Sequence, residues 1–522
     1  MYPLNRRQLL RSTVAAAALP VLPAFGSAPA MSGTKLRIDY REIVVRGRSK
    51  KVFGITQPNG KHGIVLGSRD RFRVELTNAV DDSLLIHWHG QEPPASQDGV
   101  PELSQYPLPP RTLQFYDFEP RPGTHWMHSH LGFQEQDLMS APLIVRTADD
   151  ERADMQEVVI LLHDFTFAQP ETLLADLGGL GGESHGYNHH AHAAPAPAAP
   201  SNPHAGMPGM APAPTSSPAS NPHANMPGMP GMGATPAPAA GGDMAGMAMD
   251  LNDINFDAYL ANDRTLDDPE TVRVERDGRV RLRIINAAAA TNFFIDLGAL
   301  DGRAVAVDGN PIRPMPGRRF PLAIAQRIDI LLDLPRGEGA WPVLAQREGE
   351  MELTGIVLAT ARGTVARLSG TANTAAGPLS GHDFESKLVP LSPLAVRRPD
   401  RSVQVKLTGT MSPYAWNMSA HASGENLPVE VRCGERVQIV MRNETKMPHP
   451  MHLHGHHFQV TAFEKHGQKT EIRGAIRDTV LVPPAETVTI EFDAVNPGRW
   501  AFHCHTLYHQ ATGMMSEVRY AV

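Results

Sequence analysis

Four short runs of histidine contain the residues whose types and spacing could carry out chemistry. They are His87-Trp88-His89, His128-Ser129-His130, His449-Pro450-Met451-His452-Leu453-His454 and His503-Cys504-His505. On a β-strand, residues i and i+2 point to the same face, so each His-x-His pair can present two imidazoles together. A lone buried histidine is usually a core residue. Eight convergent imidazoles without a metal would leave many buried polar groups unpaired. The four runs therefore predict a metal centre.

The last run also supplies a thiol. Cys504, His509 and His449 offer one thiolate and two imidazoles, and Met514 lies ten residues after the cysteine. Two histidines, a cysteine and a weak axial methionine are the ligands of blue-copper electron-transfer sites. Structural zinc usually takes paired C-x-x-C ligands, which the sequence lacks. We therefore expect copper, with Met514 as the axial ligand and Met515 as core filler.

The composition agrees with a protein that handles metal. The chain has 24 histidines and 22 methionines among 522 residues, against two cysteines. Imidazole suits copper, and thioether sulfur suits Cu(I). The net charge of −7 and the scattered lysines and arginines give no reason to expect a nucleic-acid partner. Because Cys504 is reserved for a metal, we expect no disulfide and predict Cys433 as a small buried hydrophobe on a strand.

A pattern that recurs three times predicts the elements that position these runs. Each copy begins with arginine, alternates apolar residues and ends with asparagine; the copies are 71–78, 279–286 and 436–443. Strict alternation is typical of a half-buried strand, and a turn glycine precedes each copy. A chain of this length is too long for one core. Three copies with turn signals between them predict an all-β chain of three β-sandwich domains.

The predicted domains cover residues 31–150, 151–378 and 379–522. The polar stretch 362–378, rich in glycine and alanine, separates the second domain from the third. The histidine runs occur only in the first and third domains. A polynuclear site must therefore form where those two domains meet, and the second domain is predicted to act as a spacer.

The first thirty residues are predicted to be a targeting segment. Arg6-Arg7 precedes an apolar stretch from Val14 to Phe25, and Ala28-Pro29-Ala30 offers a cleavage site. The paired arginines resemble a twin-arginine signal, which predicts export to the periplasm. A membrane anchor is the alternative, but Pro20 and Pro23 interrupt an apolar run shorter than the roughly 20 residues that a span needs. We expect no membrane span and a monomeric mature protein.

Residues 184–250 differ from the rest of the chain. Alanine, proline, glycine, methionine and histidine dominate, and the decapeptide 201–210 recurs with one change at 220–229. Such a composition buries too little apolar surface to offset the entropy of ordering, so a disordered insertion in the second domain is predicted. Its methionines could bind Cu(I) and its histidines Cu(II). The alternative is a spacer in which both residue types are incidental.

These motifs resemble those of the multicopper oxidases, over essentially the whole chain except the insertion. The most similar group is the three-domain bacterial one that includes copper-resistance oxidases and laccase-like enzymes. The resemblance implies three cupredoxin-like Greek-key domains and four copper ions: one type 1, one type 2 and a type 3 pair. It implies that His87 and His452 bind the type 2 copper. For the type 3 pair it implies His89, His128, His130, His454, His503 and His505, and for the type 1 site His449, Cys504, His509 and Met514.

The same resemblance implies a reaction in two halves. A small-molecule or metal-ion donor gives single electrons to the type 1 copper, expected near the surface around His509. Cys504 would pass them through His503 and His505 to the cluster that reduces O2 to water. Cu(I), Fe(II), phenols and aromatic amines are all possible donors, and Cu(I) detoxification or phenol oxidation are the favoured activities. A copper-binding or storage protein with little catalysis is the alternative. A relative that has lost its metals is disfavoured, since no ligand is missing, and so is a copper nitrite reductase.

Three acidic residues are candidates for supplying protons to the cluster. Asp98 matches an acidic residue that the family places near the type 2 copper, although Asp-Gly is also a strong turn pair. Some bacterial relatives carry a glutamate directly after the last type 1 histidine, where this chain has Gln510, which cannot exchange a proton at ordinary pH. Glu135 and Asp137 are further candidates that the sequence does not rank.

Overall fold

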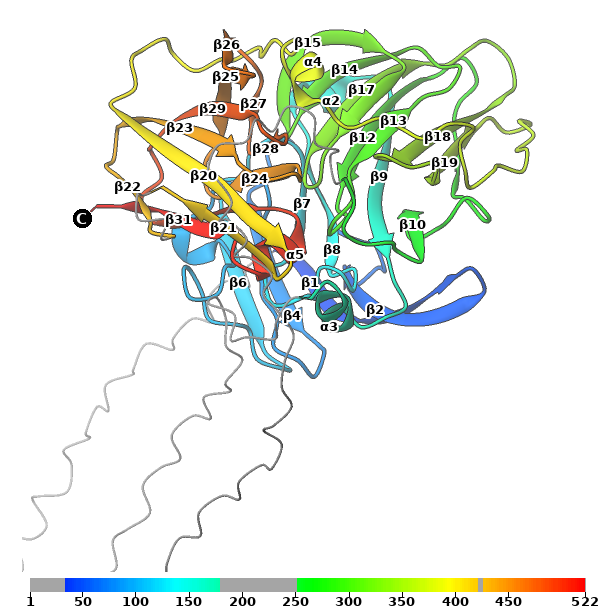
Figure 1. Ribbon diagram of the computed structural model, residues 1–522. Coiled ribbons are helices and arrows are strands. Elements are labelled where there is room, and N and C mark those ends of the chain that lie inside the picture. The colour runs from blue at the N-terminus through cyan, green and yellow to red at the C-terminus, as the bar shows by residue number, and fades with distance from the viewer. Residues whose placement is uncertain (1–32, 179–250, 421–425, 522) are drawn as a thin grey trace, which may run out of the picture. The chain divides into compact units, whose positions relative to one another are not determined.

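The computed structural model describes residues 33–178, 251–420 and 426–521, which form six β-sheets in three consecutive pairs (Figure 1). The predicted signal peptide at 1–30 and the predicted insertion at 184–250 lie outside the described residues. No helix among the described residues is long and apolar enough to cross a membrane. The predicted domain boundaries remain predictions, but the fold is all-β, as the repeated strands indicate.

The first pair of sheets contains the first two histidine runs. Its strands are ordered β2-β1-β4-β6 in one sheet and β3-β8-β7-β5 in the other. Their bounds are β1 (Thr34–Val45), β2 (Arg48–Thr56), β3 (Ile64–Leu66), β4 (Phe72–Asn78), β5 (Ile86–His87), β6 (Leu113–Phe118), β7 (Gly123–Ser129) and β8 (Ser140–Val145), with a short 3-10 turn at Ala95–Gln97.

The second pair has the orders β10-β9-β12-β17-β14-β15 and β11-β19-β18-β13-β16. Its strands are β9 (Gln156–Phe165), β10 (Ala258–Ala261), β11 (Thr271–Arg273), β12 (Arg279–Asn286), β13 (Phe293–Asp296), β14 (Gly302–Val307), β15 (Asn310–Gly317), β16 (Arg319–Leu322), β17 (Arg327–Asp333), β18 (Ala340–Arg347) and β19 (Leu353–Ala359). Two short helices accompany it, α2 (Ala148–Arg152) and α3 (Pro170–Asp176).

The third pair contains the last two histidine runs. Its orders are β21-β20-β23-β29-β25-β26, with β27 beside β25, and β22-β31-β30-β24-β28. The strands are β20 (Arg401–Met411), β21 (Tyr414–Ser419), β22 (Val429–Val431), β23 (Arg436–Asn443), β24 (His449–Leu453), β25 (Phe458–Lys465), β26 (Gln468–Glu471), β27 (Ile476–Arg477), β28 (Thr479–Val482), β29 (Thr487–Asp493), β30 (Arg499–Cys504) and β31 (Met515–Tyr520). Helix α4 (Gly381–Glu385) precedes it and α5 (Leu507–Ala511) follows β30.

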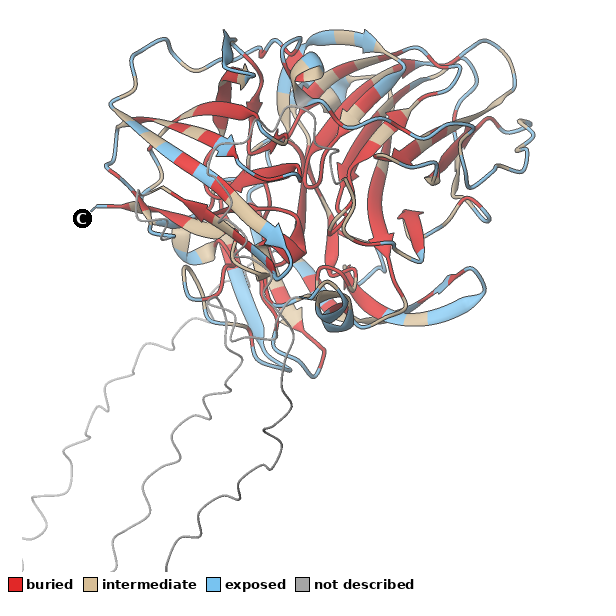
Figure 2. Ribbon diagram, viewed as in Figure 1, coloured by how far each residue is buried: buried red, intermediate tan, exposed pale blue. Residues whose placement is uncertain are grey.

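Each pair of sheets encloses its own large apolar core, and the buried residues follow the strands between the sheets (Figure 2). The three repeated sequences become β4, β12 and β23, and their closing asparagines make the same contacts. The side-chain oxygen of each buried asparagine accepts a hydrogen bond from the backbone N–H two residues later. Its side-chain NH2 donates to one carbonyl in the following loop and to another in a second segment of the chain. The acceptors from the second segment are Leu108 for Asn78, Leu322 for Asn286 and Val482 for Asn443. The repeat is therefore structural.

Strand β12 departs from strict alternation because its second half is buried on both faces. Arg283, in its middle, is fully buried and donates to Thr124 of the first sheet pair and to Asp329 of β17, each at 3.0 Å. The outer face of this sheet packs against the first sheet pair. The later polar positions of the repeat, Arg281 and Arg283, are thus covered and pair with Asp329.

The expectation for Cys433 was wrong. This cysteine is free and exposed, in the turn between β22 and β23, where the next residue, Gly434, has a φ of +87°. The chain reverses here before the repeat strand begins at Arg436, so its side chain has no core to enter. Cys504 is also free, and it is fully buried.

Candidate metal centre

Each histidine pair straddles the end of a strand. β5 ends at His87, β7 just before His130 and β30 just before His505. The alternation of a strand therefore stops inside each pair, and the rings of His87 and His89 lie 5.7 Å apart at 71° to one another. Both members of each pair nevertheless reach the same cluster: His87 and His89 share one group of three, and the rings of His452 and His454 lie 4.7 Å apart.

All eight predicted cluster histidines meet where the first and third sheet pairs adjoin. Their ring nitrogens fall into groups of three whose atoms lie within 4.8 Å of one another. The groups are His87, His89 and His452; His89, His128 and His505; and His130, His454 and His503. Every one of these side chains is buried. Each group takes ligand atoms from both ends of the chain, as the distribution of the motifs predicts.

One nitrogen of most rings is held from outside the cluster. Backbone carbonyls accept from the Nδ1 atoms: Asp98 from His87 (2.9 Å), Ser129 from His128 (3.0 Å), Asp478 from His452 (2.8 Å) and Cys504 from His503 (3.0 Å). A proton fixed on Nδ1 leaves the lone pair on Nε2, which points inward. Outer contacts of this kind set the tautomer and orientation of metal-binding imidazoles.

The inner nitrogens fit a metal. Five of them are buried without any hydrogen-bond partner, and Nε2 of His503 lies only 3.0 Å from Nε2 of His454 and 3.4 Å from Nε2 of His130. The five are His87 Nε2, His89 Nδ1, His128 Nε2, His452 Nε2 and His505 Nε2. Burial lowers the pKa of seven cluster histidines, that of His503 to about 3, so these rings are neutral and can donate lone pairs. The seven are His89, His128, His130, His452, His454, His503 and His505. Convergent unpaired lone pairs are costly in a dry interior unless a cation binds them.

Asp98 lies at this cluster, as predicted. Its Oδ2 accepts from His454 Nδ1 at 2.9 Å, and its Oδ1 lies 3.2 Å from His87 Nδ1. The turn interpretation holds as well, because Gly99 has a φ of +78° and a Cβ there would lie 1.8 Å from the carbonyl oxygen of Ile86. The glycine thus lets the chain turn tightly against β5 and brings the carboxylate to two imidazoles.

Sequence reasoning missed a second carboxylate, that of Asp478. Its Oδ1 lies 3.1 Å from His89 Nε2, and its backbone carbonyl holds His452. Arg327, on β17 of the second sheet pair, donates to both carboxylate oxygens at 2.7 and 2.5 Å. Burial alone would raise the pKa of Asp478, but the charge and hydrogen bonds of Arg327 outweigh it and hold the pKa well below its ordinary value.

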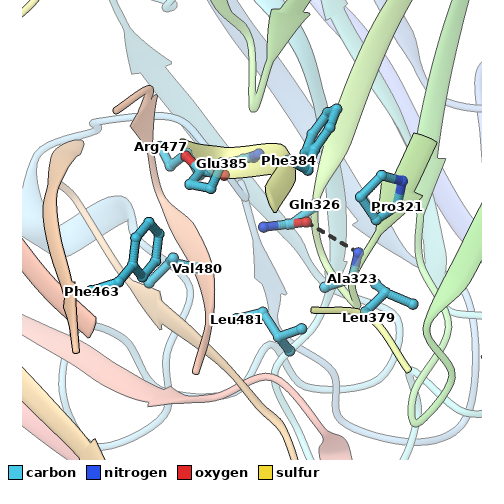
Figure 3. A pocket seen from close by; sticks show the side chains of 10 residues that line it. All are labelled: Pro321, Ala323, Gln326, Leu379, Phe384, Glu385, Phe463, Arg477, Val480 and Leu481. Atoms are coloured by element: carbon cyan, nitrogen blue, oxygen red, sulfur yellow. Dashed lines mark hydrogen bonds and ion pairs between the residues drawn. The ribbon is translucent and has the colours of Figure 1, made fainter. Parts of the chain in front are cut away.

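The second sheet pair is therefore more than a spacer, which corrects the prediction. A buried line of alternating charges continues from Arg327 to Asp308 and on to Arg477, whose guanidinium donates to Asp308 at 3.0 Å and to Glu385 at 2.8 Å. Arg477 and Glu385 line a small cavity between the second and third sheet pairs (Figure 3). The sequence does not predict this row of ion pairs, because its four residues come from separate parts of the chain.

The structure also distinguishes between Glu135 and Asp137, the two further candidates for proton supply. Glu135 Oε2 lies 2.7 Å from His128 Nδ1, and its Oε1 lies 3.9 Å from His505 Nδ1. Burial raises the pKa of Glu135 well above its ordinary value. Asp137 instead pairs with Lys50 at 2.7 Å. Only Glu135 of the two contacts the cluster.

A second group forms around the thiol. Cys504 Sγ lies 3.7 Å from His449 Nδ1 and 3.6 Å from His509 Nδ1, and these two nitrogens are 3.2 Å apart. The outer nitrogens are engaged by Thr445 (2.8 Å) and Asp253 (2.9 Å). His449, Cys504 and His509 are fully buried, and this donor set suits copper better than any other common metal.

Met514 is buried close to this group. Its amide donates to the carbonyl of His509, and its own carbonyl accepts from the amide of Cys504. It packs in the same apolar core as Cys504 and Trp416. Its place in the fold suits the axial role, which stays a prediction.

His509 is fully buried, and the expectation of a type 1 site near the surface stays a prediction. Its outer nitrogen donates to Asp253, which follows the predicted insertion in sequence and also accepts from the hydroxyl of Tyr414 at 2.5 Å. The ring of Trp416 lies 4.1 Å from that of His509. These three side chains cover the imidazole because α5 turns it inward against β21.

Comparison with known proteins agrees with this geometry. Three family models described as multicopper oxidase match residues 38–150, 235–364 and 397–522. Multicopper oxidase MmcO from Mycobacterium tuberculosis is 27% identical over 491 residues, which cover 93% of this chain and 85% of the relative. Copper resistance protein A from Escherichia coli is 26% identical over 609 residues, which cover 94% and 93%.

Solved structures show the same fold. Fet3p, a multicopper oxidase that functions in iron import, matches with a TM-score of 0.68 and 18% identity over 93% of this chain and 90% of its own. A multicopper oxidase from Pseudomonas thermotolerans matches with a TM-score of 0.60 and 21% identity, covering 93% and 99%. The sheet pairs are thus cupredoxin-like β-sandwiches, and the site is that of a copper-dependent oxidoreductase. The chain belongs to the multicopper oxidase family.

Proposed function

We propose that this enzyme couples four one-electron oxidations of a donor to the four-electron reduction of O2 to water. The observation that carries the proposal is the continuity of the two metal groups: Cys504 belongs to one, and its neighbours His503 and His505 belong to the other. An electron received at the thiolate side reaches the cluster through covalent bonds of adjacent residues. Neither group alone would give this coupling.

Four copper ions are the proposed cofactors. His449, Cys504, His509 and Met514 would hold the type 1 ion, and His87 and His452 the type 2 ion. The two remaining groups, His89 with His128 and His505 and His130 with His454 and His503, would each hold one type 3 ion. The grouping of ring nitrogens in threes supports the type 3 assignment, because these two groups have no ligand in common with each other. When bound, the coppers accept single electrons and deliver them to O2.

The protein's own acids hold or move protons around the cluster. Asp98 holds the Nδ1 proton of His454 and lies beside His87, so we propose that it supplies protons during water formation. Glu135 contacts Nδ1 of His128. Asp478 is fixed as an anion by Arg327, which suits it to orient His89 instead of exchanging a proton.

Cu(I), phenolic compounds or both are the proposed donors, with periplasmic copper detoxification as the role. Two observations favour copper: one relative is named a copper resistance protein, and residues 184–250 hold eight of the 22 methionines and six of the 24 histidines. Asp253 beside His509 offers a carboxylate where a donor's electron arrives. The twin-arginine segment supports periplasmic export, and we propose a monomer that binds extra copper on this insertion.

The donor class is tested by comparing kcat/KM for Cu(I) and for a phenol on the fully copper-loaded enzyme. Copper detoxification predicts a clear preference for Cu(I). A preference for the phenol would favour the alternative of a laccase. Binding of many copper ions with negligible O2 consumption would favour the second alternative, a storage protein.

A further inference from the structure

A cover of side chains separates His509 from solvent. The ring of Trp416 lies 4.1 Å from that of His509 at an angle of 35°, and the ring of Tyr414 lies 6.0 Å away. Asp253 accepts hydrogen bonds from both Tyr414 and His509. His509 is completely buried, and Tyr414 and Trp416 are only 2% and 4% exposed. A donor in solvent therefore cannot touch the imidazole unless one of these neighbours moves.

The backbone determines the position of Trp416. This residue lies on β21 directly opposite Gly409 of β20. A Cβ at Gly409 would lie 2.2 Å from Cε3 of the indole, so the absence of a side chain there makes room for the ring. On the other edge of β21, the amide of Trp416 donates to the carbonyl of Thr512 at 3.2 Å, and a Cβ at Gly513 would lie 2.4 Å from the carbonyl oxygen of Trp416. Two close backbone approaches thus fix the indole beside His509.

We propose that Trp416 is a specificity-determining residue, which keeps aromatic donors out of contact with His509 and favours a small metal ion. The inference rests on the proposed function and deepens it, because it distinguishes between the two proposed classes of donor. Trp416 is not one of the predicted copper ligands, so its role can be tested while the metal groups stay complete.

Size separates the two classes of donor. A phenol needs an opening as large as its ring, and such an opening requires Trp416 or Tyr414 to leave the apolar core that they share with Cys504. That movement would expose apolar surface to water. A metal ion needs only a few ligand atoms, and Oδ1 of Asp253 is buried with no hydrogen-bond partner in the described part of the chain. An ion can therefore approach His509 through a much smaller movement.

The test replaces the indole in the copper-loaded enzyme, with Trp416→Ala and Trp416→Phe as variants. We expect kcat/KM for the phenol guaiacol to rise by about tenfold or more in Trp416→Ala, and by less in Trp416→Phe, because contacts with a single side chain discriminate between donors by roughly that factor. The value of kcat/KM for Cu(I) should stay near that of the wild type. An unchanged copper content and blue absorption band would show that the type 1 site is intact.

A second readout does not depend on turnover. Fluorobenzene is an aromatic probe that resists one-electron oxidation, and paramagnetic Cu(II) accelerates the fluorine relaxation of any probe molecule that comes close. An apolar cavity of the kind that the lost indole would leave can bind benzene. We expect faster fluorine relaxation with Trp416→Ala than with the wild-type enzyme, after subtraction of the rate measured with each copper-free protein.

The matched control is the same aromatic substitution in another sheet pair. Trp341 packs, partly buried, against the core of the second pair. Trp341→Phe should leave kcat/KM for both donors and the relaxation of fluorobenzene unchanged.

Unchanged guaiacol oxidation and fluorine relaxation in a blue, copper-loaded Trp416→Ala variant would overturn the inference. Slower guaiacol oxidation would do so too, because the indole would then conduct electrons instead of excluding donors. An equal rise for Cu(I) would show that the indole excludes every donor alike. If Trp416→Ala failed to fold or to bind copper, the same measurements on Trp416→Phe would decide. Absence of O2 consumption with both donors in the wild-type enzyme would instead contradict the proposed function.

Discussion

At the scale of residues, ring nitrogens and their outer partners define the chemistry. The inner nitrogens are free because carbonyls and carboxylates occupy the outer ones, as with His87 and Asp98 or His452 and Asp478. A protein that only buried these histidines would have no reason to leave their inner nitrogens unpaired. The arrangement is prepared for metal before metal arrives, which limits the reorganisation that binding requires.

The single thiolate offers the first prediction. Cys504→Ser should abolish the intense blue thiolate-to-copper absorption and all oxidase activity while leaving the fold intact, because serine is nearly isosteric but is a poor copper ligand. Visible absorption and circular dichroism of the purified variant measure both effects. Cys433→Ser is the matched control and should keep the colour, since that thiol is exposed in a turn. A blue band in Cys504→Ser would refute the type 1 assignment.

Asp98 gives the second prediction. Asp98→Asn keeps the size of the side chain and its contact with His454 but removes the exchangeable proton. Reoxidation of the reduced enzyme by O2 should slow by about tenfold or more, whereas reduction of the type 1 copper should be nearly unaffected. Stopped-flow traces of the two half-reactions measure each rate. Equal rates in variant and wild type would leave Asp98 as a turn residue only.

The sequence is informative about ligands and much less so about their partners. The histidine ligands can be predicted from the sequence because the two members of each pair are close in the chain, and a single strand end brings both to the cluster. Asp478 reaches the same cluster from a loop far from His89 in sequence, and no spacing rule connects the two. Glu135 follows His128 by seven residues, but the sequence does not show that it contacts that ring while Asp137 pairs with Lys50 instead. Burial of His509 was also missed, because it depends on Asp253 and on β21, which the motif does not include.

At the scale of elements, strand ends and interfaces position the site. β5, β7, β24 and β30 end where the first and third sheet pairs meet, so their last residues face one another. The repeated asparagine strands were predictable because a local pattern determines them. The loss of alternation in β12 was not, because it results from packing against the first sheet pair.

Strand β17 supplies the third prediction. Arg327→Lys replaces a guanidinium that donates to both oxygens of Asp478 with a single ammonium, so the carboxylate and the carbonyl that hold His89 and His452 should shift. We expect a weakened type 2 copper signal in electron paramagnetic resonance and lower copper content, while the blue band persists.

Arg283→Lys is the matched control for this variant. Arg283 is as fully buried as Arg327, lies in the same sheet and pairs with acids, but Glu157 and Asp329 are not at the cluster. This control should lower thermal stability without changing the copper signals. Unaltered copper spectra in Arg327→Lys would show that the second sheet pair does not position the cluster.

At the scale of the whole molecule, the predicted insertion sets the fourth prediction. Deleting residues 184–249 should lower Cu(I) oxidation while sparing turnover of bulky phenols, because the deletion removes eight thioethers and six imidazoles that would concentrate copper near the enzyme. Steady-state kinetics with both donors and the stoichiometry of bound copper measure the effect. Unchanged Cu(I) kinetics and copper stoichiometry would make the segment a spacer.

The whole enzyme is tested most directly by the ratio of donor oxidised to O2 consumed, measured together with hydrogen peroxide on the copper-loaded protein. Four one-electron oxidations joined through Cys504 to one cluster predict four donors per O2 and no peroxide. Two donors per O2 with stoichiometric peroxide, or oxidation of donor without O2 consumption, would contradict the coupling of the two metal groups.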